Sequence, residues 1–211
     1  MRGTYYADGF CCGQLGCGGL FFRYDMNSGL YYDASLRAGK AKAEYNSADL
    51  SGYTGDNDNV TFNTNSSYLA GHLGIGKIQK ISPKNTMDYY GKYFYSRTGS
   101  DSVTLSSGET YDFDAVTSNR LRLGARFTHN INDHSDFYTG LAYQYEFGGG
   151  ATGHYKGFST AEPSLKGSTG VFELGYQFRP GDTPMTIDVG LNGYFGKQRG
   201  VRFQAGMNWV F

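Results

Sequence analysis

The chain ends with the segment V-R-F-Q-A-G-M-N-W-V-F, residues 201–211, in which apolar and polar side chains alternate. In an extended strand, Phe203, Met207 and Trp209 would share one face, and Arg202 would lie on the other. A long apolar strand at the end of a soluble domain invites pairing with other chains. In a bilayer the same pattern is favourable, because the apolar face meets lipid and the polar face meets an aqueous lumen. The segment therefore predicts a membrane-spanning β-strand.

The composition is compatible with a β-barrel and excludes several other classes. The 211 residues include 19 Lys and Arg against 19 Asp and Glu, so no strongly basic surface for nucleic acid is expected. Glycine is abundant, with 32 residues, and aromatic residues make up 17% of the chain. No run of 18 or more apolar residues occurs, which excludes membrane helices. Barrel strands need apolar residues only at alternate positions, so a barrel stays possible.

The same alternation recurs upstream and predicts about nine antiparallel strands of roughly ten or more residues, within one barrel domain over residues 18–211. Residues 1–17 are expected to form a loop or the remnant of a truncated strand. Short connections are expected near residues 27, 83, 133 and 181, and long ones near 56, 107 and 158. Outer-membrane barrels have short periplasmic turns and longer external loops. This asymmetry predicts an outer-membrane location with a periplasmic C-terminus.

The strand count predicts that the chain is part of a barrel. Bacterial single-chain barrels have even numbers of strands, whereas about nine are expected here. An odd number of strands is therefore predicted to precede residue 18. An unpaired strand edge has no partners for its backbone groups in hydrocarbon, which supports the same expectation.

Charged residues fall on the polar faces of the predicted strands. The charges predicted to face the lumen are Arg37, Asp88, Lys92, Arg120, Arg122, Arg126, Glu146, Glu173 and Asp188. A soluble β-sandwich would show the same alternation with its apolar faces turned inward. Strand length, loop asymmetry and the terminal aromatic residue favour the membrane.

Three arginines on one predicted strand admit two interpretations. Arg120, Arg122 and Arg126 could form an anion ladder along the lumen. They could instead pair across the barrel with the acidic residues Glu146, Asp88 and Glu173. Pairing is favoured because unpaired charges in a narrow lumen are costly.

No catalytic, cofactor or metal site is predicted. Cys11, Cys12 and Cys17 have no second pair to complete a zinc site, so a loop with one disulfide is favoured. Residues 71–77 resemble the start of a phosphate-binding loop, but Ile78 occupies the position of the Ser or Thr that binds magnesium. The four histidines show no H-E-x-x-H spacing.

Several segments resemble, in order, the C-terminal translocator domain of autotransporters, which are self-exporting outer-membrane proteins of Gram-negative bacteria. They are G-L-Y-Y-D-A-S-L-R-A-G-K (29–40), D-Y-Y-G-K-Y-F-Y-S-R (88–97), D-S-V-T-L-S-S-G-E-T-Y-D-F-D-A-V (101–116), S-N-R-L-R-L-G-A-R (118–126), Y-E-F (145–147) and P-S-L-K-G-S-T-G (163–170). The resemblance extends from about Gly18 to Phe211. It implies a twelve-stranded barrel whose lumen admits an N-terminal helix and which passes or anchors an external passenger.

The resemblance also implies partners. The last strand is similar to the signal that the barrel assembly machinery reads, and the matching positions are Phe203, Met207, Trp209 and Phe211. The implied partners are outer-membrane lipid, this assembly machinery and the passenger segment of the parent chain. No small-molecule substrate and no enzyme activity are expected.

Two other functions are consistent with a barrel. A barrel enzyme of the protease or lipase type would need a histidine that meets a carboxylate or a serine at the external rim, and His154 is the candidate. A simple porin would need a complete chain and an open lumen.

Overall fold

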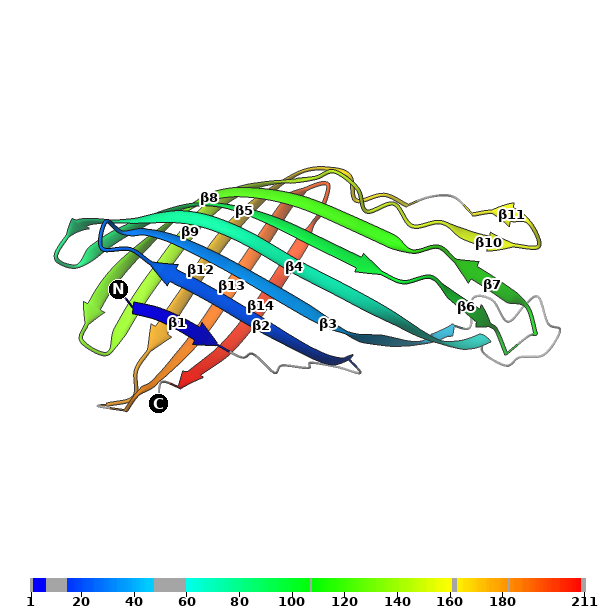
Figure 1. The fold of residues 1–211 in the computed structure, drawn as a ribbon, viewed down its shortest axis with the longest axis horizontal. Coiled ribbons are helices and arrows are strands. Elements are labelled where there is room, and N and C mark those ends of the chain that lie inside the picture. The colour runs from blue at the N-terminus through cyan, green and yellow to red at the C-terminus, as the bar shows by residue number, and fades with distance from the viewer. Residues whose placement is uncertain are drawn as a thin grey trace.

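Ten antiparallel strands form one continuous, curled sheet in the computed structural model, which describes residues 2–6, 15–47, 60–106, 108–160, 163–181 and 183–209. The strands are β1 (Arg2–Tyr6), β2 (Leu15–Asp25), β3 (Leu30–Ser47), β4 (Val60–Ser82), β5 (Asn85–Thr98), β8 (Val116–Asn132), β9 (Ser135–Glu146), β12 (Gly167–Phe178), β13 (Met185–Gly196) and β14 (Gly200–Trp209). Each pairs with its predecessor and successor in this order. Figure 1 shows the sheet bending round as a half-barrel, with β1 and β14 as its edges. In the described ranges no helix is long and apolar enough to cross a membrane.

The nine predicted strands are all present, and β1 is a tenth. Residues 2–6 pair with the end of β2, where Tyr5 lies opposite Phe22. β2 begins at Leu15, three residues before the predicted start of the domain. β4 begins at Val60, inside a segment predicted to be a polar loop. Polar residues can extend a strand there because the antiparallel ladder with β3 supplies backbone hydrogen bonds whatever the side chains.

A second, four-stranded sheet was not predicted. It contains β6 (Asp101–Thr104), β7 (Thr110–Phe113), β10 (Gly153–Tyr155) and β11 (Phe158–Ser159), in the order β11-β10-β7-β6. Figure 1 places this sheet beyond one end of the half-barrel. Tyr111 and Tyr155 stack with their ring centroids 4.7 Å apart, and Val103 is buried. Two of the segments predicted to be long loops therefore fold together into one compact unit.

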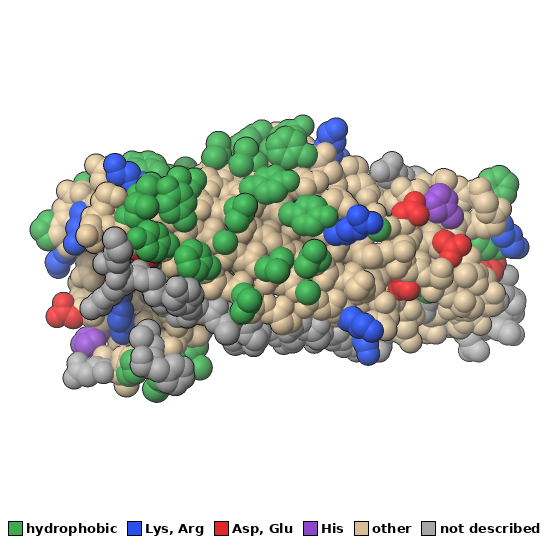
Figure 2. Space-filling model, in the orientation of Figure 1, with side chains coloured by type: hydrophobic (Ala, Val, Ile, Leu, Met, Phe, Trp, Pro, Cys, Tyr) green, Lys and Arg blue, Asp and Glu red, His purple; other side chains and the backbone are tan. Residues whose placement is uncertain are grey.

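Large apolar side chains cover the outer face of the half-barrel. Leu141 is 69% exposed and Phe203 is 78% exposed. Trp209, Phe178 and Tyr143 are also exposed. Figure 2 shows hydrophobic side chains gathered over the broad part of the sheet on the face in view. The β-sandwich alternative required these residues to pack inward, and the structure contradicts it.

Tyrosines on the inner face lie over glycines of the neighbouring strand. Tyr31 is 1% exposed, and its ring covers Gly76, its direct partner across β3 and β4. Tyr138 covers Gly175 in the same way across β9 and β12. A Cβ atom built on Gly175 would lie 2.1 Å from the Tyr138 ring, so only glycine leaves room for the tyrosine.

We expect Leu141→Arg to lower the free energy of unfolding of the barrel in phospholipid vesicles by about 2–4 kcal/mol, because a guanidinium facing acyl chains near mid-strand loses its hydration. Phe178→Arg places the same charge at the end of a strand, where the cost should be about 0–1 kcal/mol. Urea titration of both variants measures the difference. Equal costs at the two positions would contradict the orientation of the apolar belt.

We expect Gly175→Ala to displace the Tyr138 ring and to lower the free energy of unfolding by about 1–3 kcal/mol, the usual cost of overpacking. Gly206→Ala is the matched control, because a Cβ atom there meets nothing within 4 Å. The same urea titration measures both variants. The packing account fails if Gly175→Ala is as stable as Gly206→Ala.

Candidate functional site

The inner face of the half-barrel lines an open cavity of about 290 Å³. β2, β3, β4, β5, β8 and β12 contribute to its wall. Its charged lining residues are Arg23, Arg37, Lys92, Arg122, Arg126, Asp88 and Glu173. They reach the cavity because alternate residues of a strand share a face, so Tyr31 and Arg37 of β3 both point inward. We take this cavity and its wall as the candidate site.

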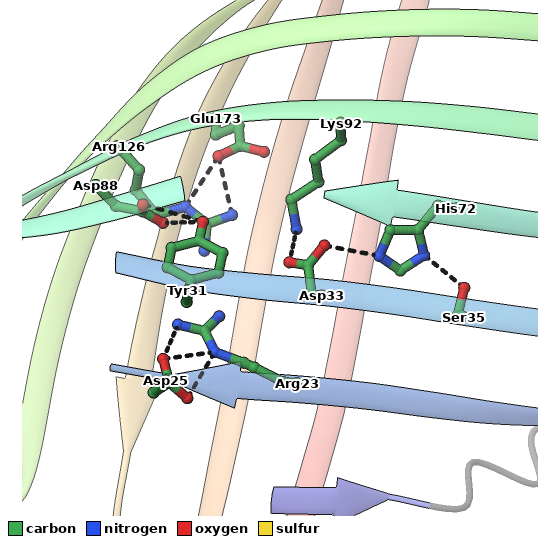
Figure 3. Close-up of polar contacts among 10 residues, drawn as sticks. All are labelled: Arg23, Asp25, Tyr31, Asp33, Ser35, His72, Asp88, Lys92, Arg126 and Glu173. Carbon is green, nitrogen blue, oxygen red and sulfur yellow. Dashed lines mark hydrogen bonds and ion pairs between the residues drawn. The ribbon is translucent and has the colours of Figure 1, made fainter. Parts of the chain in front are cut away.

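A chain of four polar side chains crosses β3, β4 and β5 (Figure 3). Lys92 Nζ donates to Asp33 Oδ2 at 2.6 Å, and His72 Nε2 donates to Asp33 Oδ1 at 3.0 Å. The Ser35 hydroxyl is hydrogen-bonded to His72 Nδ1 at 2.5 Å. Asp33 is 1% exposed in its side chain, and both of its oxygens accept a hydrogen bond. This buried carboxylate is therefore fully compensated.

A second group of paired charges lies beside the first (Figure 3). Arg126 Nη2 lies 3.0 Å from Glu173 Oε2, and Tyr31 donates to Asp88 at 3.0 Å. Arg23 forms an ion pair with Asp25 at 2.9 Å. Its guanidinium also lies 3.9 Å from the centre of the Tyr31 ring, a cation–π contact. These contacts fix one side of the cavity wall.

The three arginines of β8 have different partners. Arg126 pairs with Glu173 as expected, and Arg120 Nε lies 3.6 Å from Glu146 Oε2. Glu146 accepts the Ser118 hydroxyl and two backbone N–H groups, and the Nε of Arg120 makes no hydrogen bond to it. The expectation that all three arginines pair with these acids is wrong for Arg122, which among the described residues meets none of them.

Strand register explains the exception. Asp88 lies directly opposite Arg126, whereas Arg122 lies opposite Lys92. Arg122 bonds instead to the neutral Gln144, whose Oε1 accepts from Nε at 3.1 Å and from Nη2 at 2.7 Å.

Of the remaining predicted lumen charges, Asp188 accepts from the Tyr138 hydroxyl at 3.1 Å. Arg37 lines the cavity, and none of the residues that the structure describes forms an ion pair or hydrogen bond with its side chain. The prediction did not include Tyr31 and Gln144. The alternation of β3 and β9 places them on the inner face, but a search for charged residues passes over neutral side chains.

The residues that resemble an assembly signal lie on the outer face of β14. Phe203, Met207 and Trp209 are all exposed there. Phe211 lies outside the described residues, as do Cys11 and Cys12 and the side chain of Cys17.

Two groups contain the residue types of a hydrolase, and neither is assigned a catalytic role. Ser35, His72 and Asp33 are in contact, but Lys92 already neutralises the carboxylate. The His72 ring is also held between Phe21 and Phe94, with centroid distances of 6.0 and 5.6 Å. Together these contacts hold the His72 ring in the wall of the cavity, which is a structural role.

The second group lies on the four-stranded sheet. His154 meets Asp114 at 3.0 Å and Ser159 at 3.2 Å, which is the convergence that the enzyme alternative requires. The side chains of His154 and Asp114 are 38% and 61% exposed. Water screens interactions at such a surface, so the group lacks the low-dielectric setting that strengthens catalytic electrostatics. Among the described residues, no three His, Cys, Asp or Glu side chains are placed to hold a metal ion.

Comparison with known proteins identifies the family. A family model described as the autotransporter beta-domain matches residues 16–192. Among solved structures, a chain described as the CymD monoaromatic hydrocarbon channel is 13% identical, with a TM-score of 0.44. That alignment covers 99% of this chain and 68% of the channel. No curated protein matches the sequence. Because the family model covers most of the chain, the protein belongs to the autotransporter β-domain family of the bacterial outer membrane.

Proposed function

We propose that this domain is the translocator of an autotransporter, which anchors an N-terminal passenger in the outer membrane or exports it. The observation that carries the proposal is the division of the sheet into an apolar outer face and a polar, cavity-lined inner face. Lipid can cover the first, and a hydrated polypeptide can contact the second. Family membership supports the same function.

We propose that the C-terminus is periplasmic. The short connections after β2, β4, β8 and β12 lie at the same end of the antiparallel sheet as the end of β14. Trp209 pairs with Met185, the first residue of β13. The four-stranded sheet lies at the opposite end. Since outer-membrane barrels have their longer connections outside the cell, the four-stranded sheet would be extracellular.

We further propose that the domain acts without enzyme activity and that two partners contact its outer face. Acyl chains would cover the apolar belt. The barrel assembly machinery would read the last strand, where Phe203, Met207 and Trp209 project outward. Both contacts depend on the shape and polarity of the surface, so neither requires a catalytic group.

The direct test is to tag the passenger of the full parent protein. We expect the tag to be accessible to antibody and protease on intact cells, because the domain places the passenger outside. In a parent gene without residues 1–211, the tag should stay inside the outer membrane. A tag that stays in the periplasm while the barrel is inserted would refute the translocator function.

Removal of Phe211 from the full parent protein tests the assembly signal. We expect less heat-modifiable barrel in the outer membrane, because the terminal aromatic residue is part of the proposed signal. Electrophoresis of unheated and heated outer membranes measures this fraction. Substitution of the exposed turn residue Lys84 by Gln is the control and should leave it unchanged. Full assembly without Phe211 would contradict the proposed signal.

A further inference from the structure

The charges around the cavity are not evenly compensated. Three of its five cations have a carboxylate within 3.0 Å, namely Arg23, Lys92 and Arg126. Arg122 and Arg37 have none among the residues that the structure describes. The uncompensated positive charge therefore belongs to two identified side chains.

Neutral contacts hold Arg122 in place. Gln144 accepts two hydrogen bonds from its guanidinium and donates to Gln198 at 3.2 Å. The guanidinium carbon lies 5.5 Å from the centre of the Phe94 ring. Two donor nitrogens are thus bound to Gln144, and the guanidinium keeps further N–H groups for another acceptor.

The strand register makes this position more positive. Arg122 lies directly opposite Lys92, and like charges opposed across a strand pair destabilise a sheet. Lys92 gives its shortest contact, 2.6 Å, to Asp33 on β3, away from Arg122. A bound anion would relieve the repulsion and would supply the missing counter-charge.

We propose that Arg37 and Arg122 form an oxyanion site in the cavity, which binds a carboxylate or phosphate group. Guanidinium groups suit both ligands because their N–H groups form charge-assisted bonds with paired oxygens. The oxyanion can be an acidic side chain of the polypeptide inside the bore or a free anion. The first source rests on the proposed function, and the second does not.

Calorimetric titration of the purified full parent protein with citrate and with inorganic phosphate tests the free anion. We expect binding by the wild type and, for Arg37→Gln combined with Arg122→Gln, an affinity lower by about tenfold or more. Lys197→Gln removes an exposed cation and should change the affinity by about twofold or less. Arg122→Lys in place of Arg122→Gln keeps the positive charge at this position and should restore part of the affinity that the double variant loses.

Photo-crosslinking in cells tests the peptide source. Phe94 is replaced by p-benzoylphenylalanine in the full parent protein, and the crosslinked peptide is mapped by mass spectrometry. We expect a peptide of the parent chain that contains Asp or Glu next to the crosslink. Its yield should fall in the double arginine variant and not in Lys197→Gln.

The titration and the crosslinking together distinguish the two sources of the oxyanion. An arginine-dependent crosslink assigns the site to the parent chain, and anion binding without that crosslink assigns it to a free anion. The proposal is overturned if neither signal depends on Arg37 and Arg122 in protein that is still heat-modifiable. Passenger exposure measured in the same cells shows separately whether the translocator function holds.

Discussion

The central constraint is that every backbone N–H and C=O group inside a membrane needs a partner within the protein. An antiparallel sheet meets this need and at the same time assigns each side chain to a face, because the period of a strand is two residues. In β9, Leu141 points outward while Gln144 and Glu146 are buried on the inner side. One backbone arrangement therefore produces both the apolar belt and the polar wall.

A polar wall is stable only if its buried groups are compensated. The structure achieves this for most of these groups through contacts across several strands, such as Asp33 of β3 with Lys92 of β5, and the buried Nε of Arg120 is an exception. Tyrosines fill the remaining space where a glycine of the next strand makes room, as Gly76 does for Tyr31. The interior is thus packed by hydrogen-bonded aromatic rings and ion pairs in place of an aliphatic core.

The sequence alone predicted the parts of this fold that repeat. Alternation over ten or more residues identified nine strands, but β6, β7, β10 and β11 have two to four residues, too few for a period to be recognised. Charge partners were harder to predict, because a shift of register changes every cross-strand neighbour. Arg122 shows this: Lys92, not Asp88, is its direct neighbour.

The uneven compensation of the cavity has a physical consequence for any chain within it. An arginine that already pairs with an acid, as Arg126 pairs with Glu173, gains little from a new anion, since that anion must compete with the existing bond. Within the part of the chain that the structure describes, the hydrogen bonds of Arg122 go to the neutral amide of Gln144, so a new anion displaces no carboxylate there. Anionic groups in the bore should therefore collect near the unpaired arginines, while the paired charges keep the wall rigid.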